Sequence, residues 1–491
     1  MDARFPRRAA LVALIATALA SAAAWVYDDR VGFDKPFDRI VRDTGVIPAY
    51  AISLLIALAS SKPGRAWLVQ RVPIVSASAL GLFRMAFAAS LALVVRTIDP
   101  SFRPLCFLLL ALFAAGVAAR VSFAAFVIAF TRAHLGNTTD HAVALPLKTL
   151  WLMVVVPWGA GLSVDAAILR RVGWPPPERS RAYGLAMWIP MLMLGLAYAA
   201  AAFAKMDDVG PRWVTGGAVR YILLVDGHKA PVAWNRYIIR SDVLSVLFSG
   251  LAIAGESAVV LAAIWPTTAV VLAAGLVALG LHVSFYVLQG VWWSLWWMLL
   301  PAFVPWEAIA SRLRRGTSDA PATTERRLAW AVGLVMFAAV LQQPAASLLR
   351  TSYGFAFSDF PMYSNVYLAS RAEAIAQQEQ VFQPPPIIRF DAPQVDAALR
   401  TRIERLDGDQ VLTEIVRKIA RGEPVTDGDA ALVRDAARRH AAEFGEAVRQ
   451  VEVFADTWRF DWSSADFVPR QQWKPVATIS LDRGVIEARK P

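Results

Sequence analysis

The chain has 491 residues, of which 57% are hydrophobic and 18% charged, and its formal net charge is +11. This is too apolar for a soluble protein of that length, and the apolar residues gather in long runs, so we expect an integral membrane protein. From Arg350 onward, 19 Lys and Arg face 21 Asp and Glu, so the positive excess lies in the apolar part before it. There it indicates membrane topology and contact with lipid headgroups, not a nucleic-acid-binding face.

Cysteine usage excludes thiol redox chemistry within these residues. Cys106 is the single cysteine and lies inside an apolar run, so no internal disulfide and no Cys-x-x-Cys pair can form.

Residues 1–72 are expected to form N-terminal membrane spans. The apolar run 9–25 follows three arginines and is either a signal peptide or a retained first span, of which we favour the span. A second span at 47–61 leads to Lys62, Arg65 and Arg71, which the positive-inside rule places in the cytoplasm. The N-terminus is then cytoplasmic as well.

Residues 73–349 are expected to form the main transmembrane domain. Apolar runs predict spans at 76–95, 104–118, 121–130, 142–158, 183–204, 244–265, 267–288 and 328–341, with a loop at 162–181 and a non-spanning connection at 210–242. The whole membrane part is then an all-α polytopic bundle of about 10 to 11 spans. It is followed by a small C-terminal α+β extramembrane domain.

Three ionisable side chains stand well inside predicted spans. Arg84, Glu256 and His282 are each costly in a bilayer unless they face the bundle interior and find partners. Such groups are functional candidates by default, and structural pairing is the alternative, which we favour for Arg84. Four tryptophans at 292, 293, 296 and 297 predict a lipid-facing belt, although the flat ring of a bound molecule could stack on one of them.

Lys205 ends the apolar run 183–204, whose alanines at 199–202 and 204 allow close approach of neighbouring helices. Burial disfavours the charged form of an amine, so a buried Lys205 could serve as a base. The alternative is an interfacial lysine that snorkels to the surface beside Trp213, and composition alone favours it.

His141 stands at the mouth of the span 142–158, directly after Asp140, whose carboxylate could fix the tautomer of the imidazole. His134 lies seven residues earlier and could share a helical face with His141. Two histidines without acids at ligand spacing are a weak metal signal, and we predict no metal site.

The segment of small apolar residues, Lys205, a short polar gap, Trp213 and Gly-Gly-Ala resembles the lysine motif of the vitamin K-dependent gamma-carboxylase and its bacterial relatives, the horizontally transferred transmembrane (HTTM) domain proteins. The run Ser78–Met85 resembles the opening helix of that domain. The Asp140–His141 pair and the order of Glu256 and His282 resemble it as well. The resemblance covers residues 76–300, and an asparagine of the family is replaced here by Asp140.

The resemblance implies that Lys205 deprotonates a reduced quinone and that His141 is a second catalytic residue. Asp140, Trp213, Glu256, His282 and Arg84 would line the pocket. The implied co-substrates are reduced vitamin K of the menaquinol type, O2 and CO2. Because the chain has a single cysteine, a separate quinone reductase would have to reduce the quinone again. The family's large lumenal part, which holds its peptide substrate, has no counterpart that we can match.

Residues 350–491 are expected to form an extracytoplasmic tail domain. Amphipathic helices are predicted at 395–421 and 429–449, and strands at 451–462 and 477–488. The domain shows no catalytic constellation, and an unidentified protein would be its partner.

Two classes of function remain open from the sequence. The first is a quinol-dependent oxygenase or carboxylase in a bacterial inner membrane. The second is a non-catalytic membrane protein that binds quinone or lipid, or that scaffolds an assembly. Solute transport is less favoured, because no repeated half with broken helices is visible.

Overall fold

The protein is described here by a computed structural model. It describes residues 66–67, 69–134, 141–208, 210–313, 328, 331–333, 335, 387–391, 426–429, 431, 450–454, 458–464, 466–469, 475–480 and 485–488. The spans expected at 9–25 and 47–61, most of the span at 328–341, and nearly all of the two predicted tail helices lie outside the described residues.

The chain divides into two compact units, each drawn from separate segments. The first comprises Met1–Gly210, Gly250–Ser284 and Trp292–Asn365, and the second comprises Pro211–Ser249, Phe285–Val291 and Val366–Pro491. Two long helices, α14 (Asp242–Val259) and α16 (Thr268–Gln289), contribute residues to both.

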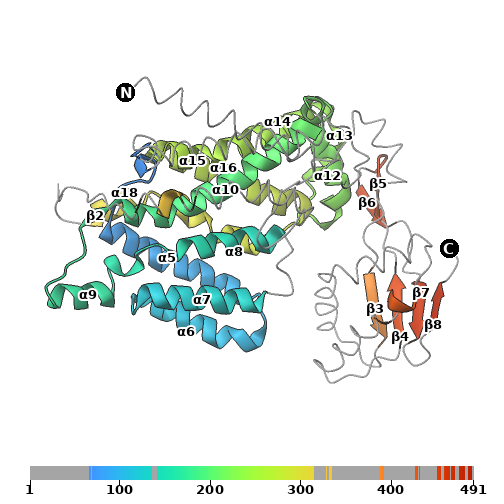
Figure 1. The fold of residues 1–491 in the computed structure, drawn as a ribbon. Helices are drawn as coiled ribbons and strands as arrows, with labels where there is room; N and C mark the ends of the chain where they lie inside the picture. Colours follow the sequence, from blue (N-terminus) through green and yellow to red (C-terminus); the bar gives the residue numbers. More distant parts are fainter. Residues whose placement is uncertain are drawn as a thin grey trace, which may run out of the picture. The chain divides into compact units, whose positions relative to one another are not determined.

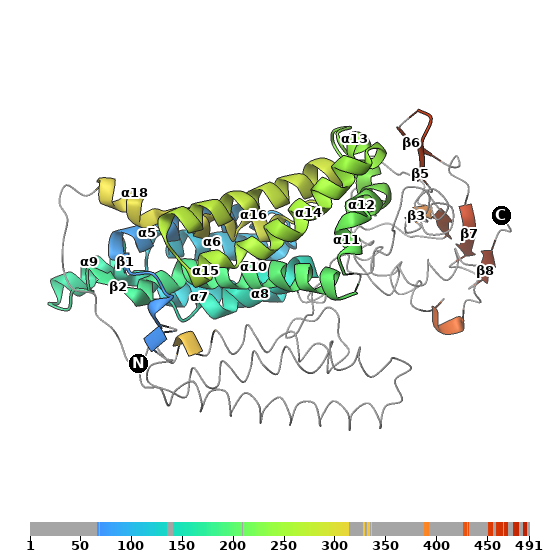
Figure 2. The same cartoon turned by 90° about the horizontal axis from the view of Figure 1, so that it is seen from above.

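The first unit is a bundle of apolar helices, seen in Figures 1 and 2. Its helices are α5 (Ala77–Val95), α6 (Arg103–Ala115), α7 (Ala119–Ala133), α8 (His141–Met153), α9 (Val164–Arg171), α10 (Arg181–Asp208), α15 (Leu261–Ile264), α17 (Ser294–Trp297) and α18 (Trp306–Leu313). Short 3-10 turns lie at η2 (Pro100–Phe102), η4 (Trp158–Ala160) and η6 (Leu300–Phe303), and β1 (Val75–Ser76) pairs antiparallel with β2 (Arg179–Ser180).

Four of the described helical segments are long and apolar enough to cross a membrane. They are Ala77–Val95, Arg181–Phe203, Asp242–Ile264 and Thr268–Gln289. Each matches a span predicted from the sequence to within a few residues. The expectation of a mostly helical membrane protein is therefore confirmed for the described part of the chain.

The core of the first unit between α5, α6 and α7 is aromatic. Trp158 is fully buried and packs against Phe83, Phe87, Phe113 and Phe123, with ring centroids 5.1 to 6.3 Å apart. Stacked and edge-on contacts of this kind add stabilisation beyond the burial of area. They fix the turn η4 against the inner face of α5.

The loop predicted at 162–181 is wrong in part, because it contains α9. Ser163 caps this helix by accepting a hydrogen bond from the backbone N–H of Ala166 at 2.9 Å. Asp165 lies in the first turn and Arg170 and Arg171 in the last, which suits the helix dipole at both ends.

The second unit combines short helices with strands. The helices are α11 (Arg212–Thr215), α12 (Ala218–Asp226), α13 (Asn235–Arg240) and the first turns of α14, with a 3-10 turn η5 (Gly227–Lys229). A four-stranded antiparallel sheet has the order β3-β4-β7-β8, formed by Ile387–Asp391, Gln450–Phe454, Pro475–Ser480 and Val485–Ala488. A separate hairpin pairs β5 (Trp458–Asp461) with β6 (Asp466–Pro469).

Each of the two long strands predicted in the tail is in fact two strands. The run 451–462 holds β4 and β5, which belong to different sheets, and 477–488 holds parts of β7 and β8, which pair with each other. Apolar residues alternate on both sides of each interruption, in the first run at 451 and 453, then at 458, 460 and 462, so the pattern predicts one strand for each run. Residues 482–484, Asp-Arg-Gly, are typical of a turn and were the missed signal.

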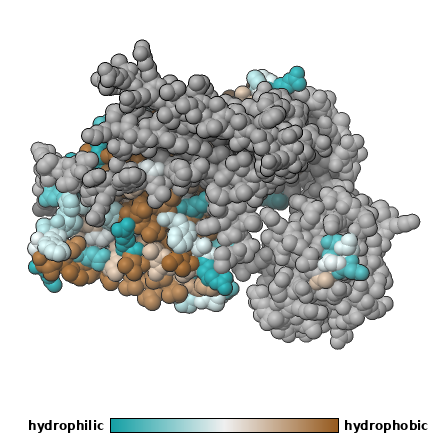
Figure 3. Space-filling model, in the orientation of Figure 1, coloured by the Kyte–Doolittle hydropathy of each residue, from teal (hydrophilic) through white to brown (hydrophobic). Residues whose placement is uncertain are grey.

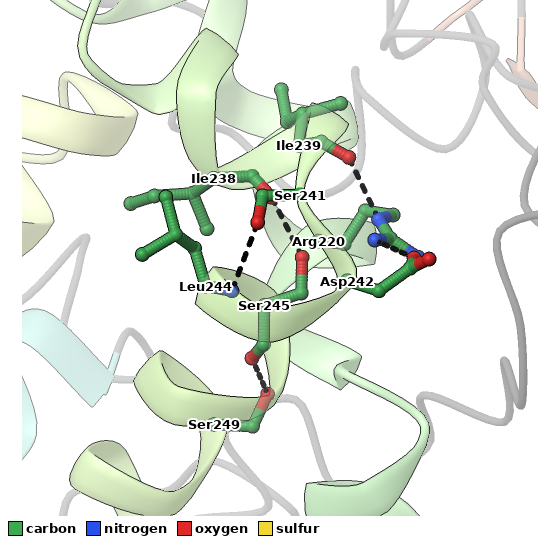
Figure 4. A network of polar contacts seen from close by, with 8 residues as sticks. All are labelled: Arg220, Ile238, Ile239, Ser241, Asp242, Leu244, Ser245 and Ser249. Carbon is green, nitrogen blue, oxygen red and sulfur yellow. Dashed lines mark hydrogen bonds and ion pairs between the residues drawn. The ribbon is translucent and has the colours of Figure 1, made fainter.

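A polar network holds the corner between α12, α13 and α14, shown in Figure 4. Arg220 is buried, donates to the carbonyl of Ile239 at 2.8 Å and pairs with Asp242. Ser245 donates to the carbonyl of Ile238 at 2.7 Å. Gly217 has a φ of 67°, and a Cβ there would lie 2.7 Å from Cβ of Ser245, so the second glycine of the Gly-Gly pair is needed for close packing.

Candidate functional site

The centre of the candidate site is an ion pair between Lys205 on α10 and Glu256 on α14. Nζ of Lys205 lies 2.6 Å from each carboxylate oxygen of Glu256. The two residues are 2% and 3% exposed. Lys205 is therefore a buried lysine held inside the first unit, and the snorkelling interpretation is wrong for this structure.

Small residues let the two helices approach each other closely enough to form the pair. Gly195 of α10 faces Val260, where an added Cβ would lie 2.6 Å from the Cα atom. About two helical turns further towards the lysine, Ala201 and Ala202 are buried. The close approach at Gly195 brings α10 next to the end of α14, and the side chains of Lys205 and Glu256 meet between the two helices.

A second buried polar pair lies two helical turns before Lys205. A hydrogen bond of 3.1 Å joins the hydroxyl of Tyr198 on α10 and Nε2 of His282 on α16. Tyr198 is fully buried and His282 is 1% exposed. Because Tyr198 and Lys205 are seven residues apart in one helix, they lie on the same face of α10.

Aromatic rings surround this second pair. The ring of His282 lies 6.0 Å from Trp296 and 5.5 Å from Trp297, and Tyr198 lies 5.8 Å from Trp296. Trp296 is fully buried, whereas Trp292 is 55% exposed and stacks on Trp297 at 4.8 Å. The belt interpretation therefore does not hold for Trp296, which packs inside the first unit.

One buried donor in this cluster has no partner. Nε1 of Trp296 makes no hydrogen bond to any group in the part of the chain that the structure describes. Buried indole N–H groups normally find an acceptor, because an unpaired one costs the energy of its lost hydrogen bond to water. This N–H beside Tyr198 and His282 can therefore donate to an acceptor oxygen, supplied by a water or by a bound molecule.

The remaining predicted site residues lie in different places. His141 begins α8, which packs against α10 and α17, but its side chain lies outside the described residues, as does Asp140. Trp213 is 1% exposed and lies on α11, in the second unit. His134 follows α7, where its Nδ1 lies 2.9 Å from the carbonyl oxygen of Phe130.

Arg84 is fully buried and binds backbone carbonyls. Its guanidinium donates to Trp158 at 2.7 Å, Gly161 at 3.0 Å, Leu162 at 2.6 Å and Ala114 at 3.3 Å. These bonds connect η4 and the two residues that follow it to the end of α6, which is the structural pairing that we favoured for this arginine.

Two residues of the cluster were missed from the sequence. Tyr198 and Trp296 are aromatic residues in apolar segments, so they look like ordinary lipid-facing or core positions. The signal that could have found Tyr198 is its spacing of seven residues from Lys205.

The arrangement can hold and move protons within an apolar bundle, through one amine–carboxylate pair and one phenol–imidazole pair. Within the described ranges, no three or more His, Cys, Asp or Glu side chains lie close enough together to bind a metal ion. Comparison with known proteins adds no relative: no family model, no curated protein and no solved structure matches this chain.

Proposed function

We propose that this membrane protein accepts a proton from a lipid-soluble quinol, with Lys205 as the base. The observation that carries the proposal is the buried pair of Lys205 and Glu256, each at most 3% exposed. The proposal assigns the chain to the HTTM domain proteins, which resemble the vitamin K-dependent gamma-carboxylase, with residues 73–349 as that domain.

Glu256 makes proton acceptance by Lys205 feasible in an apolar bundle. A lone amine that took a proton there would become an unpaired buried ammonium, which is very costly. Beside the carboxylate, the new ammonium is neutralised at once, and both carboxylate oxygens are hydrogen-bonded to it. The ion pair already holds its proton on Nζ, so Lys205 would act as the base in the state of the pair that has one proton fewer, with the free amine beside the carboxylate. The quinol proton then restores the ammonium, and the quinol keeps the electron pair of its O–H bond as an anion.

The aromatic cluster supplies a binding surface for the quinol. The indole N–H of Trp296 would donate to one quinol oxygen, and the rings of Trp292 and Trp297 would stack on the quinone plane. Tyr198 and His282 would carry a second proton through their hydrogen bond. The resemblance adds Asp140 and His141, at the start of α8, to this pocket.

The reaction class follows from the resemblance. Reduced vitamin K of the menaquinol type would react with O2 after deprotonation to give a strong base, which removes a proton from a C–H group of the acceptor. CO2 then adds to the resulting carbanion, one oxygen atom of O2 stays in the quinone epoxide, and the other leaves as water. A separate quinone reductase would regenerate the quinol. The carbon acceptor is left open by this proposal.

The proposed setting is a bacterial inner membrane, with a cytoplasmic N-terminus and about 10 to 11 spans. The segment 350–491 would be a periplasmic α+β domain that binds a protein partner.

The test uses the full-length protein in lipid nanodiscs, supplied with reduced vitamin K, O2 and bicarbonate. Epoxide is measured by mass spectrometry for the parent, for Lys205→Ala and for Leu247→Ala, a control on an exposed apolar position. Loss of a general base lowers turnover by roughly 100-fold or more, so Lys205→Ala should form almost no epoxide. Absence of epoxide from the parent, or equal turnover by Lys205→Ala, contradicts the proposal.

A second candidate function is favoured by the closed geometry of the pair. Both oxygens of Glu256 are hydrogen-bonded to Lys205, so in this second function the pair is a structural ion pair that links α10 and α14 and has no catalytic role. The protein would then bind quinone or lipid, or scaffold an assembly, without turnover. Quinone that co-purifies with both parent and Lys205→Ala, without epoxide from either, would support this function.

A further inference from the structure

Helix α9 exposes a row of large apolar side chains. Val164, Ile168 and Val172 follow one another at intervals of four residues, so they lie along one stripe of the helix. They are 43%, 53% and 61% exposed, and Leu162 and Trp174 at the two ends are 52% and 77% exposed. Exposed apolar rows of this size mark a contact surface.

Backbone geometry at both ends of α9 holds the side chains of Leu162 and Trp174 on the surface of the first unit. Leu162 has a φ of 47°, which is strained for a residue other than glycine, and its carbonyl accepts from Arg84 at 2.6 Å. At the other end, Gly173 has a φ of 81° and lets the N–H of Trp174 donate to the carbonyl of Leu169 at 2.8 Å.

Helix α9 is fixed to the turn between α6 and α7. The carboxylate of Asp165 accepts hydrogen bonds from the backbone N–H groups of Ala118 and Ala119, both at 2.8 Å. The N–H of Asp165 donates to the carbonyl of Gly116 at 3.0 Å. α9 therefore lies at the level where the α6–α7 hairpin turns back, which is an end of the apolar bundle (Figure 1).

The apolar row of α9 continues the apolar outer face of that hairpin. Leu105 and Leu108 of α6 and Val121 and Ile128 of α7 are 48% to 69% exposed. Figure 3 shows hydrophobic residues gathered on this part of the first unit. A face of that composition on a membrane bundle contacts lipid. The nearby row on α9 then contacts lipid as well, at the boundary between the acyl chains and the headgroups.

Two cations accompany the apolar row. Arg170 and Arg171 in the last turn of α9 are exposed, and in the described part of the chain neither forms an ion pair with an acidic side chain. Trp174 follows them, and tryptophan is enriched at the level of the lipid headgroups. An apolar stripe, flanking arginines and a terminal tryptophan are together typical of a helix that lies in the plane of a membrane surface.

We propose that α9 is an in-plane interfacial helix that binds anionic lipid headgroups. Val164, Ile168 and Val172 insert among the upper acyl chains, and Arg170 and Arg171 bind phosphate groups. Arg84 and Asp165 are positioning residues that hold the helix at that depth. The proposal is independent of the quinol chemistry.

The test measures depth by spin-label accessibility in the full-length protein in nanodiscs. In a Cys106→Ala background, a nitroxide is attached at Ile168→Cys, at Leu108→Cys as the lipid-exposed control, and at Ser463→Cys as the water-exposed control. Collision with O2, which concentrates in lipid, is compared with collision with a polar nickel chelate. Each set is measured in phosphatidylcholine alone and with added phosphatidylglycerol.

The proposal predicts an O2-to-nickel ratio at Ile168 that is severalfold above Ser463 and close to Leu108. Phosphatidylglycerol should raise this ratio further, and Arg170→Gln with Arg171→Gln should abolish that increase while leaving the value in phosphatidylcholine unchanged. A ratio at Ile168 equal to that at Ser463 overturns the proposal. So does an immobile label that neither reagent reaches, because a protein partner or a second copy would then cover the helix.

Discussion

Both carboxylate oxygens of Glu256 lie 2.6 Å from Nζ of Lys205, and the two side chains are almost completely buried. An amine and a carboxylate that are out of water depend on each other. Removal of either one leaves an uncompensated buried charge.

We expect Lys205→Met and Glu256→Leu each to lower the free energy of unfolding by about 3 kcal/mol or more, and the double variant to recover most of that loss. Thermal unfolding of the four proteins in one detergent measures this cycle. Additive losses in the double variant would show that the two groups do not interact. The double variant should also form no epoxide, which separates loss of the base from loss of the fold.

The hydrogen bond between Tyr198 and His282 can be tested with a matched pair of variants. Tyr198→Phe removes one hydroxyl from a fully buried ring and should cost about 1 kcal/mol. Tyr237→Phe makes the same change on a ring that is 69% exposed and should cost almost nothing. Equal unfolding midpoints for the two variants would argue against the buried bond.

The crossing of α10 near Val260 can be tested with two glycines. Gly195→Ala places a methyl group 2.6 Å from Cα of Val260, so the helices must separate, at a cost of roughly 1 to 3 kcal/mol. An added Cβ at Gly280 meets nothing within 4 Å. Gly280→Ala should therefore be neutral or stabilising by up to about 1 kcal/mol. Thermal unfolding of both variants and the parent measures these differences. A Gly195→Ala variant as stable as the parent would contradict the close approach of α10 to Val260.

The burial of His134 should make the stability of the protein depend on pH. Burial lowers the pKa of His134, and the hydrogen bond to the carbonyl of Phe130 opposes this only in part. Below the ordinary pKa of about 6.5 the unfolded chain binds a proton that the folded protein resists, so stability falls as pH falls. His134→Gln should lose less stability than the parent between about pH 7 and about pH 5. The same loss in both proteins would mean that His134 does not titrate differently on unfolding.

The long helices could be predicted from the sequence because their length and apolar composition are local properties. The span expected at 76–95 is α5, and that at 267–288 is α16. The short helix α9 depends on a distant contact, the bonds from Asp165 to Ala118 and Ala119, which local composition does not reveal.

Three members of the described cluster could be predicted from the sequence, but their pairing could not. The free-energy cost of an ionisable side chain in a bilayer identified Lys205, Glu256 and His282 as candidates. Which of them meet depends on how α10, α14 and α16 pack, and Lys205 and Glu256 are 51 residues apart. Tyr198 was missed because its ring suits an apolar helix, and only the neighbouring His282 shows that its hydroxyl has a partner.

Chemical rescue tests the role of Lys205 most directly. Epoxide formation by Lys205→Ala in nanodiscs is measured with and without small primary amines, alongside the parent and Leu247→Ala. If the amine of Lys205 is the base, the variant forms almost no epoxide, and small amines restore turnover while leaving Leu247→Ala unaffected. Turnover by Lys205→Ala at the parent's rate without added amine would contradict the account.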